Sequence, residues 1–207
     1  MASTPSWHLD DADPIAAEHR YTFYKPSREL VARVQPGEAV KLIFRFHSDD
    51  PETPGAERMW VLVDEVLADG SFRGRLNNEP FHITDLKLDD PIAFRPCHVI
   101  ATEHDDHDNL VERYIKRCFV TNRVLEDGQR VGYLYREEPD DENDSGWRIT
   151  AGDESDDYMD DAGNLAYVSL GAVLSEDDSF RELLDEPTGS ALARNPETGE
   201  FEADEVS

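Results

Sequence analysis

Hydrophobic and polar residues alternate along several short segments in the first half of the chain, and a period of two predicts half-buried β-strands. Ala68-Asp-Gly-Ser71 separates two of these segments and is typical of a hairpin turn. The predicted strands cover residues 39–46, 58–67, 72–76, 81–84 and 91–94. Short strands at this close spacing predict a small antiparallel sheet or a partial barrel. Within it, we expect Trp60 and Phe72 to be core residues.

The second half repeats this pattern and adds short helices. Strands are predicted at residues 118–125, 131–136, 147–149 and 165–170. Ser175 is placed to cap a helix at 177–184, whose inner face carries Phe180 and Leu184. In the first half, Ser27 is placed to cap a helix that ends before Pro36. The fold class predicted is α+β, with two small β-rich domains, antiparallel sheets and a few short helices.

The composition of successive segments predicts where the domains divide. Residues 1–20 are polar, acidic and contain two prolines, which indicates a loose leader. Residues 195–207 are polar and punctuated by glycine and proline, which indicates a turn followed by a frayed end. The predicted organisation is a leader with a short helix (1–37), a small antiparallel β domain (38–103), an acidic bridge with a helical turn (104–116), an α+β domain (117–194) and a tail (195–207).

The chain has 207 residues and a formal net charge of −27, and this charge is unevenly distributed. Residues 1–103 contain 11 Lys/Arg and 18 Asp/Glu, whereas the remainder contains 9 and 29. Nucleic-acid binding needs a basic surface, and an anionic membrane repels an acidic one, so we predict neither partner. Two interpretations of the acidity are open. It attracts a basic protein partner, or it only keeps the protein soluble, as in a salt-rich cytoplasm.

Cysteine content and the N-terminal residues indicate the compartment. Cys97 and Cys118 lie in hydrophobic surroundings and do not form a disulfide framework. The first 13 residues lack the basic and apolar regions of a signal peptide, and no apolar run approaches the 18 or so residues of a membrane span. We therefore expect a cytoplasmic protein, with export by a leaderless route as an alternative.

The sequence contains few groups that suggest catalysis. His104 and His107 stand among aspartates, a pattern that can hold zinc, but one short turn cannot readily supply four ligands. No histidine follows His107, and Ser145 does not lie in a Gly-x-Ser-x-Gly elbow. Phosphate-binding and dinucleotide-binding motifs are absent from the sequence. We predict that the protein is not an enzyme, with no catalytic residue, no bound metal and no cofactor.

The stretch from Gly132 to Asp160 combines a strand, a long acidic loop, a second strand and a third acidic segment. Loops held by strands are where binding residues concentrate, and aromatic residues and methionine are favoured at interface cores. Trp147, on the middle strand, is predicted to anchor the core. If the loops on either side of it emerge together, they form one negative patch. The predicted partner-binding residues are Asp140, Asp141, Glu142, Asp144, Asp153, Glu154, Asp156, Asp157, Tyr158, Met159 and Asp160.

Two resemblances to families follow from specific motifs. Met59-Trp-Val-Leu-Val63 and Asn77-Asn-Glu-Pro80 resemble a small bacterial family of unknown function, over residues 38–100. Cys118-Phe-Val-Thr121, Val131-Gly-Tyr-Leu-Tyr-Arg136, Asp144-Ser-Gly-Trp147 and Gly152-Asp-Glu154 resemble the thirty-third immunity-protein family of bacterial polymorphic toxin systems, over residues 117–194. The second resemblance implies an α+β domain that binds and neutralises a cognate toxin.

Three functions are therefore considered. The first is a protein-binding module, an immunity protein whose acidic surface neutralises a toxin domain, which we expect to be basic. The second is a housekeeping or regulatory protein outside toxin systems, with a structural or small-molecule role. The third is a metal-dependent or acid/base enzyme, for which the sequence provides the least support.

Overall fold

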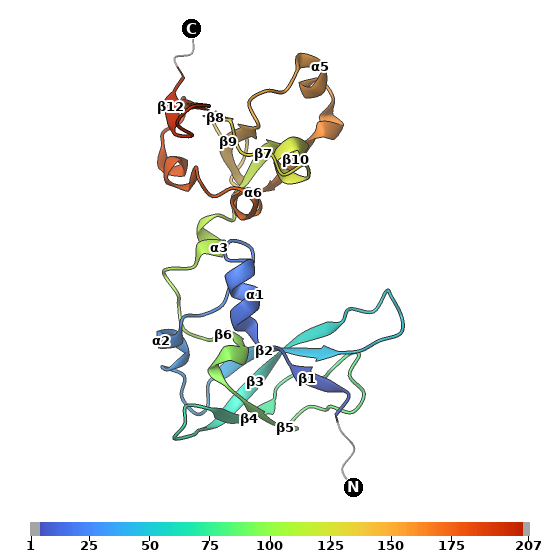
Figure 1. Cartoon of the computed structure of the whole chain (residues 1–207). Coiled ribbons are helices and arrows are strands. Elements are labelled where there is room, and N and C mark those ends of the chain that lie inside the picture. The colour runs from blue at the N-terminus through green and yellow to red at the C-terminus, as the bar shows by residue number, and fades with distance from the viewer. Residues whose placement is uncertain (1–4, 205–207) are drawn as a thin grey trace. The chain divides into compact units, whose positions relative to one another are not determined.

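The computed structural model describes residues 5–204, which form two compact units (Figure 1). Among the described residues, the first unit comprises 5–19 and 23–109, and the second comprises 20–22 and 110–204. Each unit contains one sheet rich in antiparallel pairs together with short helices. The predicted α+β class is thus confirmed. We describe each unit by itself.

The first unit is built on an antiparallel sheet in which β1 to β5 are neighbours in chain order and β6 pairs with β2. β1 and β6 pair with different parts of β2, near Phe44 and Leu42 respectively. The strands are β1 (Trp7–Leu9), β2 (Ala39–Phe46), β3 (Ala56–Val66), β4 (Phe72–Leu76), β5 (Pro91–Phe94) and β6 (Val99–Ala101). The helices are α1 (Ala12–Glu18), α2 (Arg28–Val31) and the 3₁₀ turn η1 (Pro96–His98).

The core of the first unit follows from the alternation along its strands. Met59, Val61 and Val63 of β3 are buried, because alternate residues of a strand point to the same face. Phe72 is buried as predicted. Trp60 lies on the other face of β3, where the Lys41 ammonium sits 4.9 Å from the centre of its ring, so the prediction that Trp60 is a core residue is wrong.

Two predicted features of the first unit differ in the structure. The loose leader is wrong for residues 7–18, because Trp7–Leu9 pairs with β2 and the Asp11 carboxylate caps α1; residues 1–4 lie outside the described part. The prediction of a strand at residues 81–84 is also wrong. The backbone N–H of Phe81 donates to the Glu57 carboxylate at 2.9 Å, and Glu57 also accepts the next two backbone N–H groups, so no strand ladder forms. The Ser27 cap of α2 is confirmed.

The second unit is built on a sheet of order β10-β7-β9-β8-β11-β12, in which β7 and β9 are parallel and the other pairs are antiparallel. Its strands are β7 (Arg117–Thr121), β8 (Tyr133–Arg136), β9 (Asp144–Thr150), β10 (Leu165–Ser169), β11 (Ala191–Arg194) and β12 (Phe201–Ala203). Its helices are α3 (Leu110–Arg113), α4 (Asn122–Leu125), α5 (Asp156–Met159), α6 (Leu170–Glu176) and the 3₁₀ turns η2 (Ala162–Asn164) and η3 (Arg181–Asp185).

The core of the second unit lies on one face of this sheet. Trp147 of β9 is fully buried there, among residues of β7, β8, α4 and α6. Tyr21 also belongs to this core: its hydroxyl donates to the Asp178 carboxylate at 2.8 Å, and its ring packs edge-on against Tyr114. Three residues from near the N-terminus are therefore part of the second unit.

Three predicted elements of the second unit are corrected. The strand expected at 118–125 ends at Thr121, where α4 begins. The helix expected at 177–184 is replaced by α6, which Ser169 caps in place of Ser175, and by the short turn η3. The tail is not frayed at 201–203, because β12 pairs with β11 and Phe201 packs against the core. Residues 205–207 lie outside the described part.

The domain boundaries stay a prediction, which limited proteolysis tests. We expect cleavage in the segment 102–109, where Glu103, Asp105 and His107 are exposed. The second unit should then remain protected as residues 110–207 with the Tyr21 segment still bound. Fragment masses after size-exclusion chromatography provide the measurement. Tyr21→Ala should weaken this protection, and a single protected core spanning 102–109 would contradict two independent units.

Candidate functional site

The Asp144-Ser-Gly-Trp147 motif forms an irregularity in β9, just before Trp147 and Arg148. The side chains of these two residues point to opposite faces of the sheet. The register with β7 shifts between Arg117 and Phe119, which face Asp144 and Arg148 respectively. Gly146 has a φ of +80°, and a Cβ there would collide with the carbonyl of Glu137, so only glycine fits. Trp147 then points into the core, and Arg148 points to the other face.

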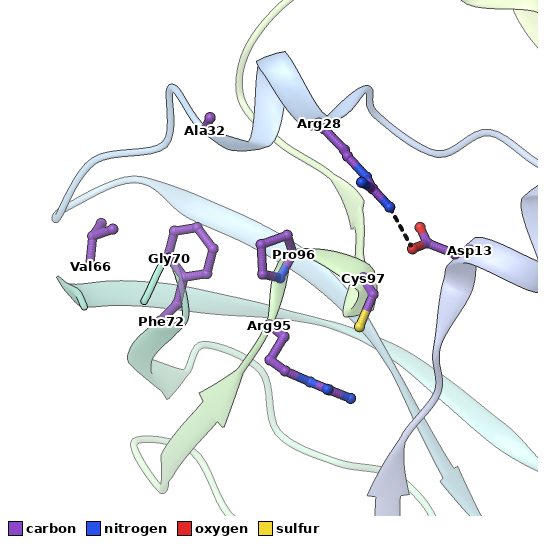
Figure 2. Close-up of a pocket in the computed structure, with 9 residues that line it drawn as sticks. All are labelled: Asp13, Arg28, Ala32, Val66, Gly70, Phe72, Arg95, Pro96 and Cys97. Atoms are coloured by element: carbon purple, nitrogen blue, oxygen red, sulfur yellow. Dashed lines mark ion pairs between the residues drawn. The ribbon is translucent and has the colours of Figure 1, made fainter. Parts of the chain in front are cut away.

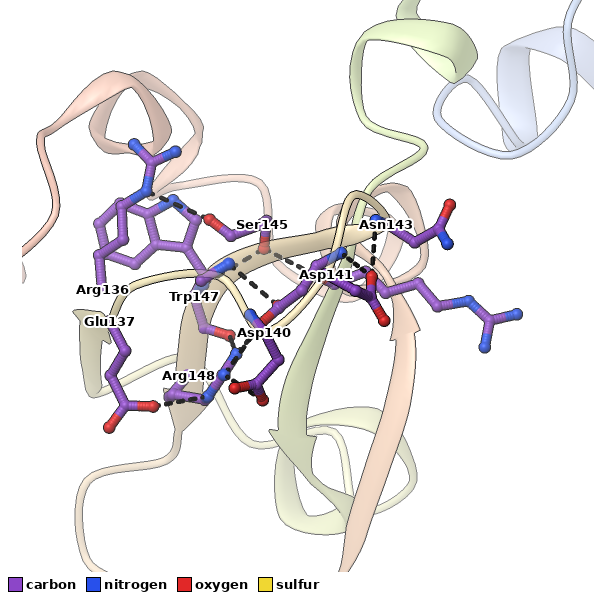
Figure 3. Close-up of polar contacts among 11 residues, drawn as sticks. Arg136, Glu137, Asp140, Asp141, Asn143, Ser145, Trp147 and Arg148 are labelled. Carbon is purple, nitrogen blue, oxygen red and sulfur yellow. Dashed lines mark hydrogen bonds and ion pairs between the residues drawn. The ribbon is translucent and has the colours of Figure 1, made fainter.

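Arg148 and Asp144 form a buried ion pair. Figure 3 shows Arg148 with Glu137 and Asp140 beside it. The two guanidinium NH₂ groups, Nη1 and Nη2, donate to the carboxylate oxygens at 3.1 and 3.0 Å, while Nε donates to Glu137 at 3.0 Å. The Asp144 carboxylate also accepts the backbone N–H groups of Asp140 and Gly146. The hydrogen bonds from Arg148 are the main cause that lowers the pKa of Asp144 to about 2. Asp144 therefore stays charged and serves the fold.

Glu154 of the Gly152-Asp-Glu154 motif also makes internal contacts. Its carboxylate accepts the Thr121 hydroxyl at 2.6 Å and the backbone N–H groups of Ala151 and Gly152. Burial raises the pKa of Glu154, but these hydrogen bonds outweigh it, so the pKa lies below the usual range. Glu154 closes the turn after β9 against the end of β7 and stays charged. No lysine, arginine or histidine in the described part of the chain forms an ion pair with it.

The remaining predicted binding residues lie on exposed or half-buried surface. The Asp140 carboxylate is 3.7 Å from the Arg148 guanidinium, and the Asp153 carboxylate forms an ion pair with Arg123. The Asp141 carboxylate accepts the backbone N–H groups of Asn143 and Asp144 and so closes its own turn. The others are in the loop before β9 or on α5. These are Glu142, Asp156, Asp157, Tyr158, Met159 and Asp160.

The two acidic loops leave from opposite ends of β9. This strand has seven residues, so it separates the loops by about 20 Å. The expectation that they emerge together as one negative patch is therefore wrong. The loop before β9 instead meets the sheet at Arg148, and the loop after β9 meets it at Met159.

Between these loops lies the face of the sheet that α4 and α6 do not cover, which we call the open face. It is formed by Phe119, Tyr133, Tyr135, Arg148 and Tyr167. The register places Tyr167, Phe119, Arg148 and Tyr135 in one row across β10, β7, β9 and β8. Phe119 is 37% exposed. Tyr133, Tyr135 and Tyr167 are half-buried, and Arg148 is buried. A partly exposed row of aromatic residues on a sheet suits a protein contact.

A pocket of about 380 Å³ opens on this face, and we call it the tyrosine pocket. Tyr133 and Tyr135 line it from β8, with their ring centres 5.9 Å apart. Glu154 and Met159 line it from the loop after β9. The pocket thus combines aromatic surface, a thioether and a carboxylate. Met159 and Glu154 were among the binding residues predicted from the sequence, but Tyr133 and Tyr135 were not. Their alternation with buried Leu134 was the signal that both rings lie on the face opposite the core.

The first unit contains a separate pocket of about 490 Å³ (Figure 2). Phe72 and Pro96 contribute its apolar surface, and Arg28 at its edge pairs with Asp13 at 3.9 Å. Cys97 also lines it, but burial raises the pKa of this thiol, which is therefore protonated at neutral pH and a poor nucleophile. This pocket offers hydrophobic surface and no evident catalytic group.

His104 and Ser145 are occupied by structural contacts. His104 Nε2 lies 3.1 Å from the Glu38 carboxylate. Ser145 Oγ donates to the carbonyl of Arg117 and accepts the backbone N–H of Trp147. Within residues 5–204, no three His, Cys, Asp or Glu side chains are grouped as a metal site would need. None of the helices described has the length and apolar character that crossing a membrane requires.

One region of the chain matches a known family model, and this region contains the motifs of β7, β8 and β9. Residues 118–205 match the Immunity protein Imm33 domain. The match covers less than half of the chain and lies within the second unit. It supports the predicted immunity family and indicates a toxin-immunity role with a protein partner. Immunity proteins of this kind are generally not enzymes.

No curated protein and no solved structure gives a significant match to the chain. The similarity of the first unit to a family of unknown function therefore stays a prediction. The Imm33 match includes the tyrosine pocket, the open face and both acidic loops. It also extends over β11 and β12, which sequence analysis placed in or beside a tail.

Proposed function

We propose that this protein is an immunity protein whose second unit binds a toxin domain and blocks its activity without catalysis. The observation that carries the proposal is the open face, a partly exposed aromatic row within the Imm33 match. The two acidic loops leave β9 on either side of this row, one before Asp144 and one after Thr150. The protein acts inside the cytoplasm, where a toxin would reach its target.

The partner surface that fits this arrangement is basic with an apolar centre. Phe119 and Tyr167, whose ring centres are 4.8 Å apart, provide the apolar contact. Glu137, Asp140 and Asp144 surround Arg148, and Arg117 lies over the ring of Tyr167. Three carboxylates therefore face two guanidinium groups, and the face has a small excess of negative charge. Such complementarity raises the association rate and selects against acidic partners.

The carboxylates on α5 and beside it have a different role in binding from the carboxylates around Arg148. Asp156 and Asp157 lie in the first turn of α5 and are exposed, without an ion-pair partner in the described chain. Asp153, Asp160 and, in the other loop, Asp141 and Glu142 are likewise exposed. We assign these groups to the rim, where they attract the toxin from a distance. Asp144 and Glu154 hold the frame, and Tyr158 and Met159 lie nearer the contact.

Charge reversal at Asp156 and Asp157 to lysine should slow association with the toxin about tenfold or more at low salt. At 1 M salt, where the Debye length is about 3 Å, the effect should fall below about threefold. Dissociation should change little, because rim charges act mainly on encounter. The measurement is surface plasmon resonance at several salt concentrations, with the partner that co-purifies from the native host.

The matched control reverses Asp49 and Glu52, two exposed carboxylates of the first unit, and changes the net charge by the same amount. This control should retain most of the association rate. Equal loss in both variants would indicate a non-specific charge effect, and salt-independent kinetics in the wild type would contradict the rim assignment. Binding that survives deletion of the second unit would overturn the proposed function.

A further inference from the structure

Aromatic rings in the sheet of the second unit are regularly covered by arginine. The distances from the guanidinium carbon to the ring centre run from 4.3 to 5.6 Å, within the range of favourable cation–π contact. The pairs are Arg148 over Phe119, Arg117 over Tyr167, Arg136 over Trp147 and Arg194 over Phe201. Stacking of guanidinium groups on rings is therefore a repeated feature of this sheet.

Tyr133 and Tyr135 are the exception on the open face. Among the described residues, no arginine or lysine is stacked on either ring. Tyr135 is the direct neighbour of Arg148 across β8 and β9, so it continues the row of rings and guanidinium. These two half-buried rings form the wall of the tyrosine pocket. The pocket therefore has aromatic surface available for a cation from outside.

The charge at the pocket also favours a cation. Glu154 is charged, and its three hydrogen bonds come from neutral groups, so no internal cation compensates it. Arg194 contributes to the lining, but its guanidinium already donates to Asp177 at 3.0 Å and to the carbonyl groups of Val131 and Gly199. An arginine side chain entering the pocket would meet Glu154 directly. Its planar group would lie against the tyrosine rings, which lysine matches less well.

We propose that the tyrosine pocket binds one arginine side chain of the protein partner. This inference rests on the proposed function, because it assigns that arginine to the toxin. The guanidinium of the bound arginine would lie beside Tyr135 and so continue the row that runs from Tyr167 through Arg148. Arg148 does not repel it strongly, because Asp144 and Glu137 compensate the charge of Arg148. Met159 would cover the methylene groups of the arginine.

The test is an NMR titration of the full chain with Nα-acetyl-arginine amide, which needs no toxin. Saturable shifts are expected at the backbone amides of Tyr133, Thr150 and Gly152. The citrulline analogue has the same shape without the charge and should bind about tenfold or more weakly. Tyr133→Leu should weaken binding of the arginine amide by about 2- to 30-fold, the range of a cation–π contact. Tyr167→Leu, on the same face outside the pocket, should leave it unchanged.

Three results would overturn the assignment: equal binding of the citrulline and arginine amides, shifts confined to α5 and the loop before β9, or no saturable shift. A stable fold in both variants is checked by their spectra, and Glu154→Gln provides a second substitution that should weaken binding. Failure here with retained toxin binding would remove the pocket assignment alone. Arginine binding without any toxin partner would remove the proposed function and leave the pocket.

Discussion

Trp147→Ala is expected to lower the free energy of unfolding of the second unit by about 3–5 kcal/mol. The Trp147 side chain is fully buried, and its indole N–H donates to the carbonyl of Leu184 at 3.3 Å. Alanine would leave a large cavity at the centre of the sheet and an unpaired carbonyl. Urea denaturation followed by circular dichroism measures the change. With a total stability of about 5–15 kcal/mol for a typical domain, this loss is large.

The matched control is Trp60→Ala in the first unit. Trp60 is half-buried on the outer face of β3, so its removal should cost much less than that of Trp147. Trp147→Phe should give an intermediate loss, since it keeps part of the volume. A stable Trp147→Ala protein that no longer binds its partner would contradict the core assignment and would make Trp147 a contact residue.

Arg148→Met should destabilise the second unit by a similar amount, about 3–5 kcal/mol, because it leaves Asp144 buried with a charge that no cation balances. The double variant Asp144→Asn with Arg148→Met should recover more than half of this loss, since both charges are then removed. Equal stability of the single and double variants would contradict a coupled buried pair. Denaturation midpoints of the four proteins complete the double-mutant cycle.

The same pair predicts a dependence of stability on pH. Unfolded Asp144 would have a pKa of about 3.9, and the folded group has a pKa of about 2. Its contribution is therefore complete above about pH 5 and is lost as the pH falls from about 4 through 2. A shift of this size corresponds to about 2–3 kcal/mol. Asp144→Asn should flatten this part of the curve. Glu154 and Asp177, whose pKa values are also lowered, keep the rest of the acid sensitivity.

Sequence patterns predicted every strand that has five or more residues. The segments 39–46, 72–76 and 91–94 coincide with β2, β4 and β5, and alternation identified all three. The missed strands, β1, β6, β11 and β12, are three or four residues long. Such short segments give too few alternations to recognise. In addition, β1 and β6 pair with β2, which lies far away in the chain.

Only part of the candidate site could be predicted, because the roles of its residues depend on contacts between distant parts of the chain. Acidic residues between Pro139 and Asp160 were visible as a run, but a run does not say which carboxylates fold back on the protein. Asp144 and Glu154 do so because Arg148 and the turn amides lie within reach. Tyr133 and Tyr135 were assigned to a strand and given no role, because which face of that strand lacks covering helices depends on the whole sheet.

The proposed function requires that the open face binds a toxin and neutralises it. A photo-crosslinking amino acid at Phe119, compared with one at exposed Phe81 of the first unit, identifies the partner in the native host. The decisive measurement is the growth rate of a strain that produces this partner with or without the protein. We expect arrest by the partner alone, rescue by the wild type and loss of rescue by Phe119→Arg. A partner without toxicity, or full rescue by Phe119→Arg, would contradict it.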